Sequence, residues 1–269
     1  MNQTSKYVLA TGAAATPRLR LLNDIFGPAS RELLIKAGLR GGQRVAEIGC
    51  GTGLMALWMA DEVGNGGSVI AVDVSGEQLQ IARQTAVPAE LKNISFHTAD
   101  AYNTHLSHGE FDLVYSRFLF CHLTRPPEAL AEMKRLLKTG GVLVAEDFEM
   151  SSVRTYPATP AYTRLVEISR GVDSRLGVNS DVGANLHSLF QDGGFLRPEI
   201  VVHEAAFLRG ERKRFWEMTL REAGHGIVEC GAATEDELRS VLTEMDEIAR
   251  DEATLVLVAR VFQLWASKP

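Results

Sequence analysis

The stretch RVAEIGCGTGL, residues 44–54, constrains the fold of this chain more than any other feature of its sequence. It places an apolar run directly before three alternate glycines, Gly49, Gly51 and Gly53, and an apolar helical pattern follows them. Glycine adopts backbone conformations that other residues avoid, and it lets a ligand approach the main chain closely. The stretch therefore predicts a buried strand, a tight ligand-binding loop and a helix, in that order.

The same alternation of strand and helix continues along the chain. Short runs rich in Val, Ile, Leu and Phe are separated by segments whose apolar residues have helical spacing. This pattern is typical of parallel strands joined by right-handed crossovers, with helices on both faces of the sheet. We predict an α/β fold with a doubly wound, mostly parallel seven-stranded sheet. The expected strands are residues 45–49, 68–75, 94–100, 111–118, 141–149, 199–208 and 253–265.

The length of 269 residues suits one large domain or two small ones, and no low-complexity linker divides the chain. We therefore expect a single domain over residues 1–269. Two segments look added to its core: a possible lid after the fifth strand, and a helical insertion that a capping box at Thr234 and Glu237 supports. The expected parts are a helical cap (1–40), a core (41–150), a lid (151–181) and a carboxyl-terminal half (182–269) with a helical insertion (209–250).

Composition and charge narrow the classes of partner. The net charge is −6, and no apolar run is long enough to span a membrane. The first twenty residues lack the apolar core of a secretion signal, so we expect a cytoplasmic protein. The one dense basic cluster, RGERKR at 209–214, is too short for a nucleic-acid groove, and we interpret it as a solvated helix face. We expect neither a nucleic-acid nor a membrane partner, and either a monomer or a homodimer.

Metal-binding residues do not form a recognisable set. Three widely spaced cysteines, Cys50, Cys121 and Cys230, give neither a disulfide framework nor a zinc motif. His97, His105 and His108 are close in sequence, but no cysteine or carboxylate completes a ligand set beside them. We therefore predict reduced thiols and no metal.

The residues around the glycines discriminate between ligands. A triphosphate-binding loop needs Gly-Lys-Ser/Thr, yet Leu54 follows Gly53; a dinucleotide fingerprint needs a third glycine at the position of Leu54. Glu47 comes directly before the loop and would repel a pyrophosphate. A zwitterionic amino acid carrying a sulfonium is instead attracted by a carboxylate.

At this point the sequence resembles the class I S-adenosylmethionine-dependent methyltransferases, and in particular the bacterial small-molecule type. Their glycine-rich first motif is similar to VAEIGCGTG, and their second-strand acid is matched by Asp73 in IAVDVS. TADA with Asp100, FDLVYSRFLFCHL and LLKTGGVLVAED resemble the motifs of the next three strands. The resemblance covers residues 40–150 well, and its one departure is Thr139, where Pro is commoner.

The resemblance implies a cofactor site for S-adenosylmethionine at the carboxyl ends of the strands. Asp73 would accept hydrogen bonds from both ribose hydroxyls, and Asp100 would lie beside the adenine amino group. Arg117 could orient the methionine carboxylate or a substrate anion. For Gln78 a capping-box role with Ser75 competes with a ribose contact. The expected cofactor-binding residues are Tyr7, Glu47, Gly49, Cys50, Gly51, Gly53, Asp73, Val74, Gln78, Asp100, Ala101, Ser116 and Arg117.

Catalytic residues are less constrained, because the sulfonium is a good leaving group and alignment supplies much of the rate. If the nucleophile is a hydroxyl, His122 or Asp147 could take its proton. Alternation along the strand does not decide whether Glu146 or Asp147 faces the substrate. Aromatic candidates for the acceptor pocket are Phe148, Tyr156, Tyr162 and Trp216.

The resemblance therefore predicts that the protein transfers a methyl group to an O, N or C atom of a small molecule, which could belong to secondary metabolism. The alternative is a protein that binds the cofactor without methyl transfer, as a cyclase or a ligand-binding module, because fold does not fix chemistry. A nicotinamide-dependent dehydrogenase is a third reading, which Leu54 and Glu47 disfavour.

Overall fold

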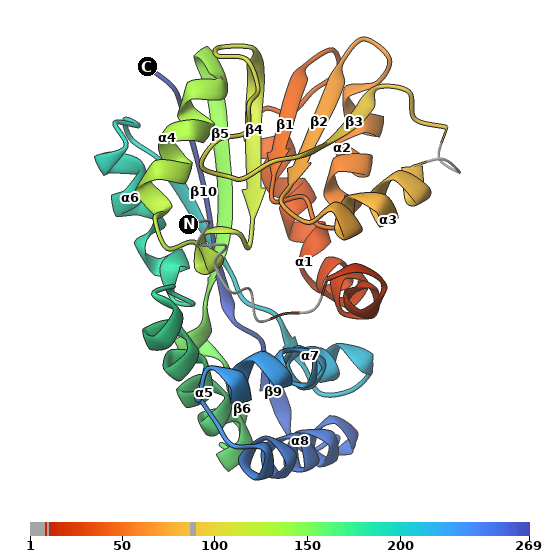
Figure 1. The fold of residues 1–269 in the computed structure, drawn as a ribbon, viewed down its shortest axis with the longest axis vertical. Coiled ribbons are helices and arrows are strands. Elements are labelled where there is room, and N and C mark those ends of the chain that lie inside the picture. Colours follow the sequence, from red (N-terminus) through yellow and green to blue (C-terminus); the bar gives the residue numbers. More distant parts are fainter. Residues whose placement is uncertain (1–8, 10, 87–89) are drawn as a thin grey trace.

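The computed structural model describes residues 9, 11–86 and 90–269, and its centre is a seven-stranded sheet of order β3-β2-β1-β4-β5-β10-β7 (Figure 1). All neighbouring pairs from β3 to β5 are parallel, and β10 runs antiparallel to both β5 and β7. The predicted doubly wound, mostly parallel sheet is therefore confirmed. Its strands are β1 (Arg44–Ile48), β2 (Ser68–Asp73), β3 (Ile94–Thr98), β4 (Phe111–Arg117), β5 (Leu137–Glu149), β7 (Glu199–His203) and β10 (Arg260–Ser267).

Helices cover both faces of this sheet because each presents an apolar stripe to it. On one face, α1 (Thr16–Lys36), α2 (Leu54–Val63) and α3 (Gly76–Ala86) bury Leu34, Met59 and Leu79 against the inward side chains of β1 and β4. On the other face, α4 (Pro126–Leu136) and α6 (Leu186–Asp192) bury Met133 and Phe190.

Three strands leave the main sheet at its edge and form a second, smaller sheet. β5, β10 and β7 are neighbours in the main sheet, and β6 (Arg154–Tyr156), β9 (Leu255–Leu257) and β8 (Ala206–Phe207) repeat that order in the small one. The expected single strands 199–208 and 253–265 are therefore wrong, since each is broken in two. The alternation of apolar residues continues through each break, so only the hydrogen-bonded pairing with neighbouring strands reveals where one strand ends and the next begins.

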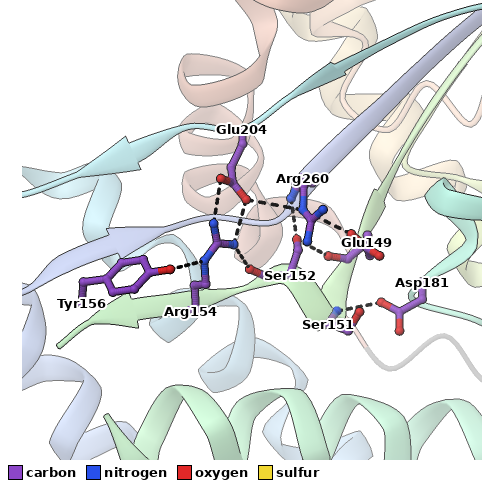
Figure 2. Close-up of polar contacts among 8 residues, drawn as sticks. All are labelled: Glu149, Ser151, Ser152, Arg154, Tyr156, Asp181, Glu204 and Arg260. Carbon is purple, nitrogen blue, oxygen red and sulfur yellow. Dashed lines mark hydrogen bonds and ion pairs between the residues drawn. The ribbon is translucent and has the colours of Figure 1, made fainter. Parts of the chain in front are cut away.

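An ionic network lies where the strands cross from one sheet to the other (Figure 2). Arg154 binds Glu204 with both terminal nitrogens, at 2.9 and 3.0 Å, and donates to the Ser152 carbonyl oxygen at 2.7 Å. Arg260 pairs with Glu149 at 3.3 Å and with Glu204 at 3.6 Å. The network joins all three crossing strand segments.

The small sheet packs under a helical layer with its own hydrophobic core. α5 (Pro160–Leu176), α7 (Phe215–Glu229) and α8 (Glu235–Arg250) surround this core, below the main sheet in Figure 1. The capping box of Thr234 and Glu237 begins α8, as expected from the sequence. Residues 151–181 thus do not lie alone over the sheet edge as a separate lid, because α5 shares its core with the later helices.

The basic cluster 209–214 is only in part the solvated face expected from the sequence, since residues 209–212 are exposed but Lys213 and Arg214 are not. Lys213 is buried, and its Nζ donates to the backbone oxygens of Asp251 and Thr254. Arg214 pairs with Glu217 at 2.8 Å and with Asp246 at 2.9 Å. The cluster anchors α7 to α8. In the part of the chain that the structure describes, no helix is long and apolar enough to cross a membrane.

Candidate active site

The glycine loop joins β1 to α2 at the carboxyl edge of the sheet. Gly49, Gly51 and Gly53 all have positive φ, at 79°, 53° and 75°. A Cβ on Gly49 would lie 3.0 Å from Leu119 and one on Gly53 would lie 3.0 Å from Ala82, whereas one on Gly51 would meet nothing within 4 Å. Two of the glycines are needed for packing, and Gly51 leaves its backbone open to a ligand.

Asp73 ends β2 and holds the loop in place. Its two carboxylate oxygens accept from the backbone N–H groups of Gly51 and Ser75, each at 2.8 Å. Each oxygen keeps a second lone pair. Burial raises the pKa of Asp73, and its backbone hydrogen bonds oppose that shift. The side chain is therefore fixed in orientation and can still accept two further hydrogen bonds.

Gln78 does not complete the capping box proposed for it. The Ser75 hydroxyl accepts from the Gln78 backbone at 3.3 Å, but the Ser75 N–H bonds to Asp73 instead of to the Gln78 side chain. The Gln78 Oε1 atom is buried and has no hydrogen-bond partner among the described residues. This side chain lines the cavity described below, so its oxygen can accept a hydrogen bond from a ligand there.

Glu47 and Arg117 place opposite charges beside the loop. Glu47 is buried, its Oε2 makes no hydrogen bond to any described residue, and burial raises its pKa to about 8 while the Arg117 charge opposes the shift. Arg117, at the end of β4, is held by α1 through Ser30 Oγ at 3.2 Å and Asn23 Oδ1 at 3.3 Å. A cationic ligand group would restore the ionised carboxylate.

A cavity of about 500 Å³ gathers these residues. Asp100 lines it from an Asx turn, in which Tyr102 N–H donates to Asp100 Oδ1 at 2.9 Å. Ser116 is fully buried and does not line the cavity, and Tyr7 lies outside the described residues. The expected cofactor residues that line it are Glu47, Gly49, Cys50, Gly51, Asp73, Val74, Gln78, Asp100, Ala101 and Arg117. Gly53 acts behind them, in the turn itself.

The two expected catalytic residues are separated by the structure. His122 lies in η2 (Phe120–His122) and lines the cavity; burial and then the Arg18 charge lower its pKa to about 4, so the ring is neutral at pH 7. Asp147 is fully buried, lines no described cavity, and accepts from the Cys121 backbone at 3.1 Å. Glu146 is also buried, where it bonds to Tyr115 and Gln263. Asp147 therefore positions the turn that carries His122.

A second cavity of about 140 Å³ adjoins the first, between α5 and α7. The two cavities share His122, Phe148, Trp216 and Thr219 in their walls. The Phe148 and Trp216 rings meet edge to face at 6.0 Å. Of the other aromatic candidates, Tyr156 is 54% exposed, and the buried Tyr162 donates to a backbone oxygen without lining either cavity.

Sequence reasoning missed the contribution of α1 to the site. Arg18 and Leu22 line the larger cavity, and Arg18 is buried with Nε and one terminal nitrogen bonded to Glu222, both at 2.9 Å. Arg18 and Glu222 are 204 residues apart, so no local pattern could have paired them. Ser30 and Asn23 were missed for the same reason.

The residues fit S-adenosylmethionine in kind. A buried carboxylate with one oxygen that lacks a hydrogen-bond partner, as in Glu47, suits an amino or sulfonium group, and Asp73 offers the two acceptors that a pair of ribose hydroxyls needs. Asp100 and the backbone around Ala101 line the same cavity, at the end of β3. No group of three or more His, Cys, Asp or Glu among the described residues could hold a metal ion.

Comparison with known sequences agrees with this chemistry. Residues 46–145 match the model of a methyltransferase domain family. The ubiquinone/menaquinone biosynthesis C-methyltransferase UbiE of Azotobacter vinelandii is 28% identical over 157 residues, which is 56% of this chain and 62% of that protein. An uncharacterized 37.1 kDa protein in a Streptomyces fradiae transposon is 30% identical over 172 residues, 62% of this chain and 48% of that protein. The chain thus matches about half to three fifths of these relatives' length.

Comparison with solved structures shows a shared fold. A Bacillus halodurans protein assigned as a methyltransferase superposes with a TM-score of 0.63 at 18% identity, over 89% of this chain and 98% of that one. The cyclase SpnF gives a TM-score of 0.56 at 21% identity, over 90% of this chain and 81% of that one. Both similarities cover more of the chain than the matched residues 46–145.

Proposed function

Since this chain belongs to the class I S-adenosylmethionine-dependent methyltransferases, we propose that it transfers the methyl group to an O, N or C atom of a small molecule. The observation that supports this proposal is the pair of adjoining cavities. The larger one carries the glycine loop and Asp73, and the smaller one is mostly apolar and shares a wall with it. A cofactor and an acceptor can then meet at that wall, beside His122 and Trp216.

The chain's own residues account for binding and alignment. Glu47 attracts the positive charge of the methionine part, Asp73 fixes the ribose, and Arg117 orients a carboxylate. When bound, the cofactor supplies an electrophilic methyl carbon on a good leaving group. The apolar walls of the second cavity exclude water and hold the acceptor in line, which is the larger part of the catalysis required.

We assign to His122 the role of accepting the proton that a hydroxyl acceptor loses during methyl transfer. It lines both cavities, and its low pKa keeps the ring neutral, so it can accept a hydrogen bond from a hydroxyl nucleophile. An amine acceptor that arrives uncharged needs no base. Asp147 supports His122 through the backbone of η2 and does not reach the acceptor.

Calorimetric titration with S-adenosylmethionine tests the cofactor site first. We expect the wild type to bind, and Asp73→Asn to bind about 30-fold more weakly, because one charged acceptor at the ribose is replaced by a donor; this corresponds to roughly 2 kcal/mol. Glu62→Gln, an exposed carboxylate on α2, is the matched control and should bind like the wild type. Equal affinity of the Asp73 variant would contradict the assignment.

Release of adenosylhomocysteine tests the transfer itself. The similarity to SpnF, which is named as a cyclase, supports a second candidate function. In this alternative the protein keeps the fold and binds the cofactor but transfers no methyl group. Incubation with candidate acceptors and mass spectrometry distinguish the two. Adenosylhomocysteine that appears in proportion to a methylated product supports the transferase, and an altered substrate with unchanged cofactor supports the cyclase.

A further inference from the structure

The smaller cavity is built from one face of each of two helices. α5 and α7 face each other across it, and most of the side chains they contribute are aliphatic or aromatic. Its volume of about 140 Å³ is close to that of cavities that accept a single aromatic ring. On α5 the lining residues follow helical spacing, as Leu165, Ile168, Ser169, Val172, Asp173 and Leu176.

Asp173 is the only carboxylate in the wall of this cavity, within the part of the chain that the structure describes. Its Oδ2 accepts from Ser180 twice, from the backbone N–H at 2.9 Å and from the hydroxyl at 2.6 Å. The Ser169 hydroxyl donates in turn to Ser180 Oγ at 3.0 Å. Both of these hydrogen bonds to the carboxylate use Oδ2, so its orientation is fixed and Oδ1 keeps its accepting capacity.

We propose that Asp173 recognises the methyl acceptor, and that the acceptor is a ring-sized apolar molecule carrying a hydroxyl or amino group that donates to Asp173 Oδ1. This proposal rests on the proposed function, because it takes the smaller cavity as the acceptor site. An apolar ligand without a donor would displace water from Oδ1 and would leave this oxygen without a hydrogen bond. A site of this kind rejects such ligands strongly, since a buried polar group left unpaired is costly.

The same carboxylate also braces the turn after α5, and the test must separate the two roles. Asp173 fixes Ser180, whose backbone oxygen accepts from Met150 N–H at 3.0 Å. A purely structural role would change stability without changing which ligands are preferred. The readout is therefore a reversal of preference, from ligands that donate a hydrogen bond to ligands that accept one. A residue that only braces the turn cannot produce such a reversal.

Three probes of nearly equal shape provide that readout: benzyl alcohol, benzaldehyde and toluene. Their binding to the full chain saturated with adenosylhomocysteine can be measured by ligand-observed NMR titration. We expect the wild type to bind benzyl alcohol about tenfold more tightly than toluene or benzaldehyde. In Asp173→Asn we expect the amide oxygen to keep the Ser180 bonds and the NH₂ group to take the place of Oδ1, so the preference should pass to benzaldehyde.

Two further variants keep the test decisive. Ser180→Ala retains the carboxylate and the backbone hydrogen bond to it but removes the hydroxyl bond, which loosens its orientation and should reduce the alcohol preference about threefold. Ala223→Phe fills the cavity from α7 and should abolish binding of all three probes. A wild type that binds alcohol and toluene equally, or an alcohol preference unchanged in Asp173→Asn, overturns the proposal. Adenosylhomocysteine affinity is measured separately: its absence refutes the proposed function, and its presence without alcohol preference refutes only the role of Asp173.

Discussion

The two cavities are built in different ways, although they share a wall. The larger cavity draws most of its polar groups from loops that follow β1 to β4, within about 75 residues of one another, and several of these groups are backbone or backbone-braced. The smaller cavity is lined by side chains of α5 and α7, which pack together with α8 in a separate core. In the proposed function, cofactor binding thus depends on local backbone geometry, while the acceptor is selected by helix faces that can change without altering the loop.

The electrostatic contrast between the cavities is equally clear. The larger one contains Glu47 and Asp73, two buried carboxylates whose pKa values are raised by burial. The smaller one has a mostly apolar wall with Asp173 as its carboxylate. Burial raises the pKa of Asp173 as well, so both cavities carry a cost of burying charge, and the larger cavity carries more of it because it holds two such carboxylates.

Glu47→Gln should give the largest effect on this contrast. The Glu47 pKa is about 8 in the folded chain against 4.5 ordinarily, so the folded state binds the extra proton and loses stability as pH rises from 4.5 to 8. The Gln variant removes this loss and should be more stable than the wild type by up to about 5 kcal/mol above pH 8, with little difference below pH 4.5. Urea unfolding at pH 4, 7 and 9 measures it.

The same variant should bind S-adenosylmethionine more weakly, because the amide does not attract a positive charge. Glu62→Gln serves as the control, since it alters an exposed carboxylate and should leave the pH dependence unchanged. Parallel stability curves for the wild type and Glu47→Gln would show that Glu47 is ionised in the folded protein at neutral pH, and would remove the electrostatic contrast between the cavities.

Ala223→Phe should separate the two cavities in steady-state kinetics. The added ring occupies the smaller cavity, so the KM for an identified acceptor should rise at least tenfold, about 1.4 kcal/mol, while affinity for S-adenosylmethionine changes less than twofold. His225→Phe places a phenyl ring on the exposed side of α7 and is the matched control. Equal loss of cofactor affinity would mean that the cavities act as one site.

Arg154→Met should give the smallest effect, at the junction of the two sheets. The change removes a two-point pairing with Glu204 and a bond to the Ser152 carbonyl oxygen (Figure 2). Because the network is partly exposed, we expect a loss of about 1 kcal/mol. Hydrogen exchange should accelerate in α5 and β9 and stay unchanged in β1 to β4. A uniform acceleration would indicate that both layers unfold together.

Local sequence patterns correctly predicted those elements that depend on residues close together in the chain. The first five strands, the glycine turn and the capping box of α8 all follow from spacing within short windows. They failed at strands 199–208 and 253–265, because an apolar run keeps its alternation while it passes from one sheet to another. They also failed at Lys213, whose burial depends on backbone oxygens about forty residues away.

The sequence by itself determined the first five strands of the main sheet, the glycine loop, and the positions of Glu47, Asp73 and Asp100 near strand ends, because each depends on residues within a few positions of it. The tertiary structure decided that Asp147 is buried behind the turn of His122, that Arg18 and Asn23 of α1 reach the site, and that α5 and α7 enclose a second cavity. These contacts join residues that are distant in the chain, and packing of side chains, which has no short-range signature, fixes them.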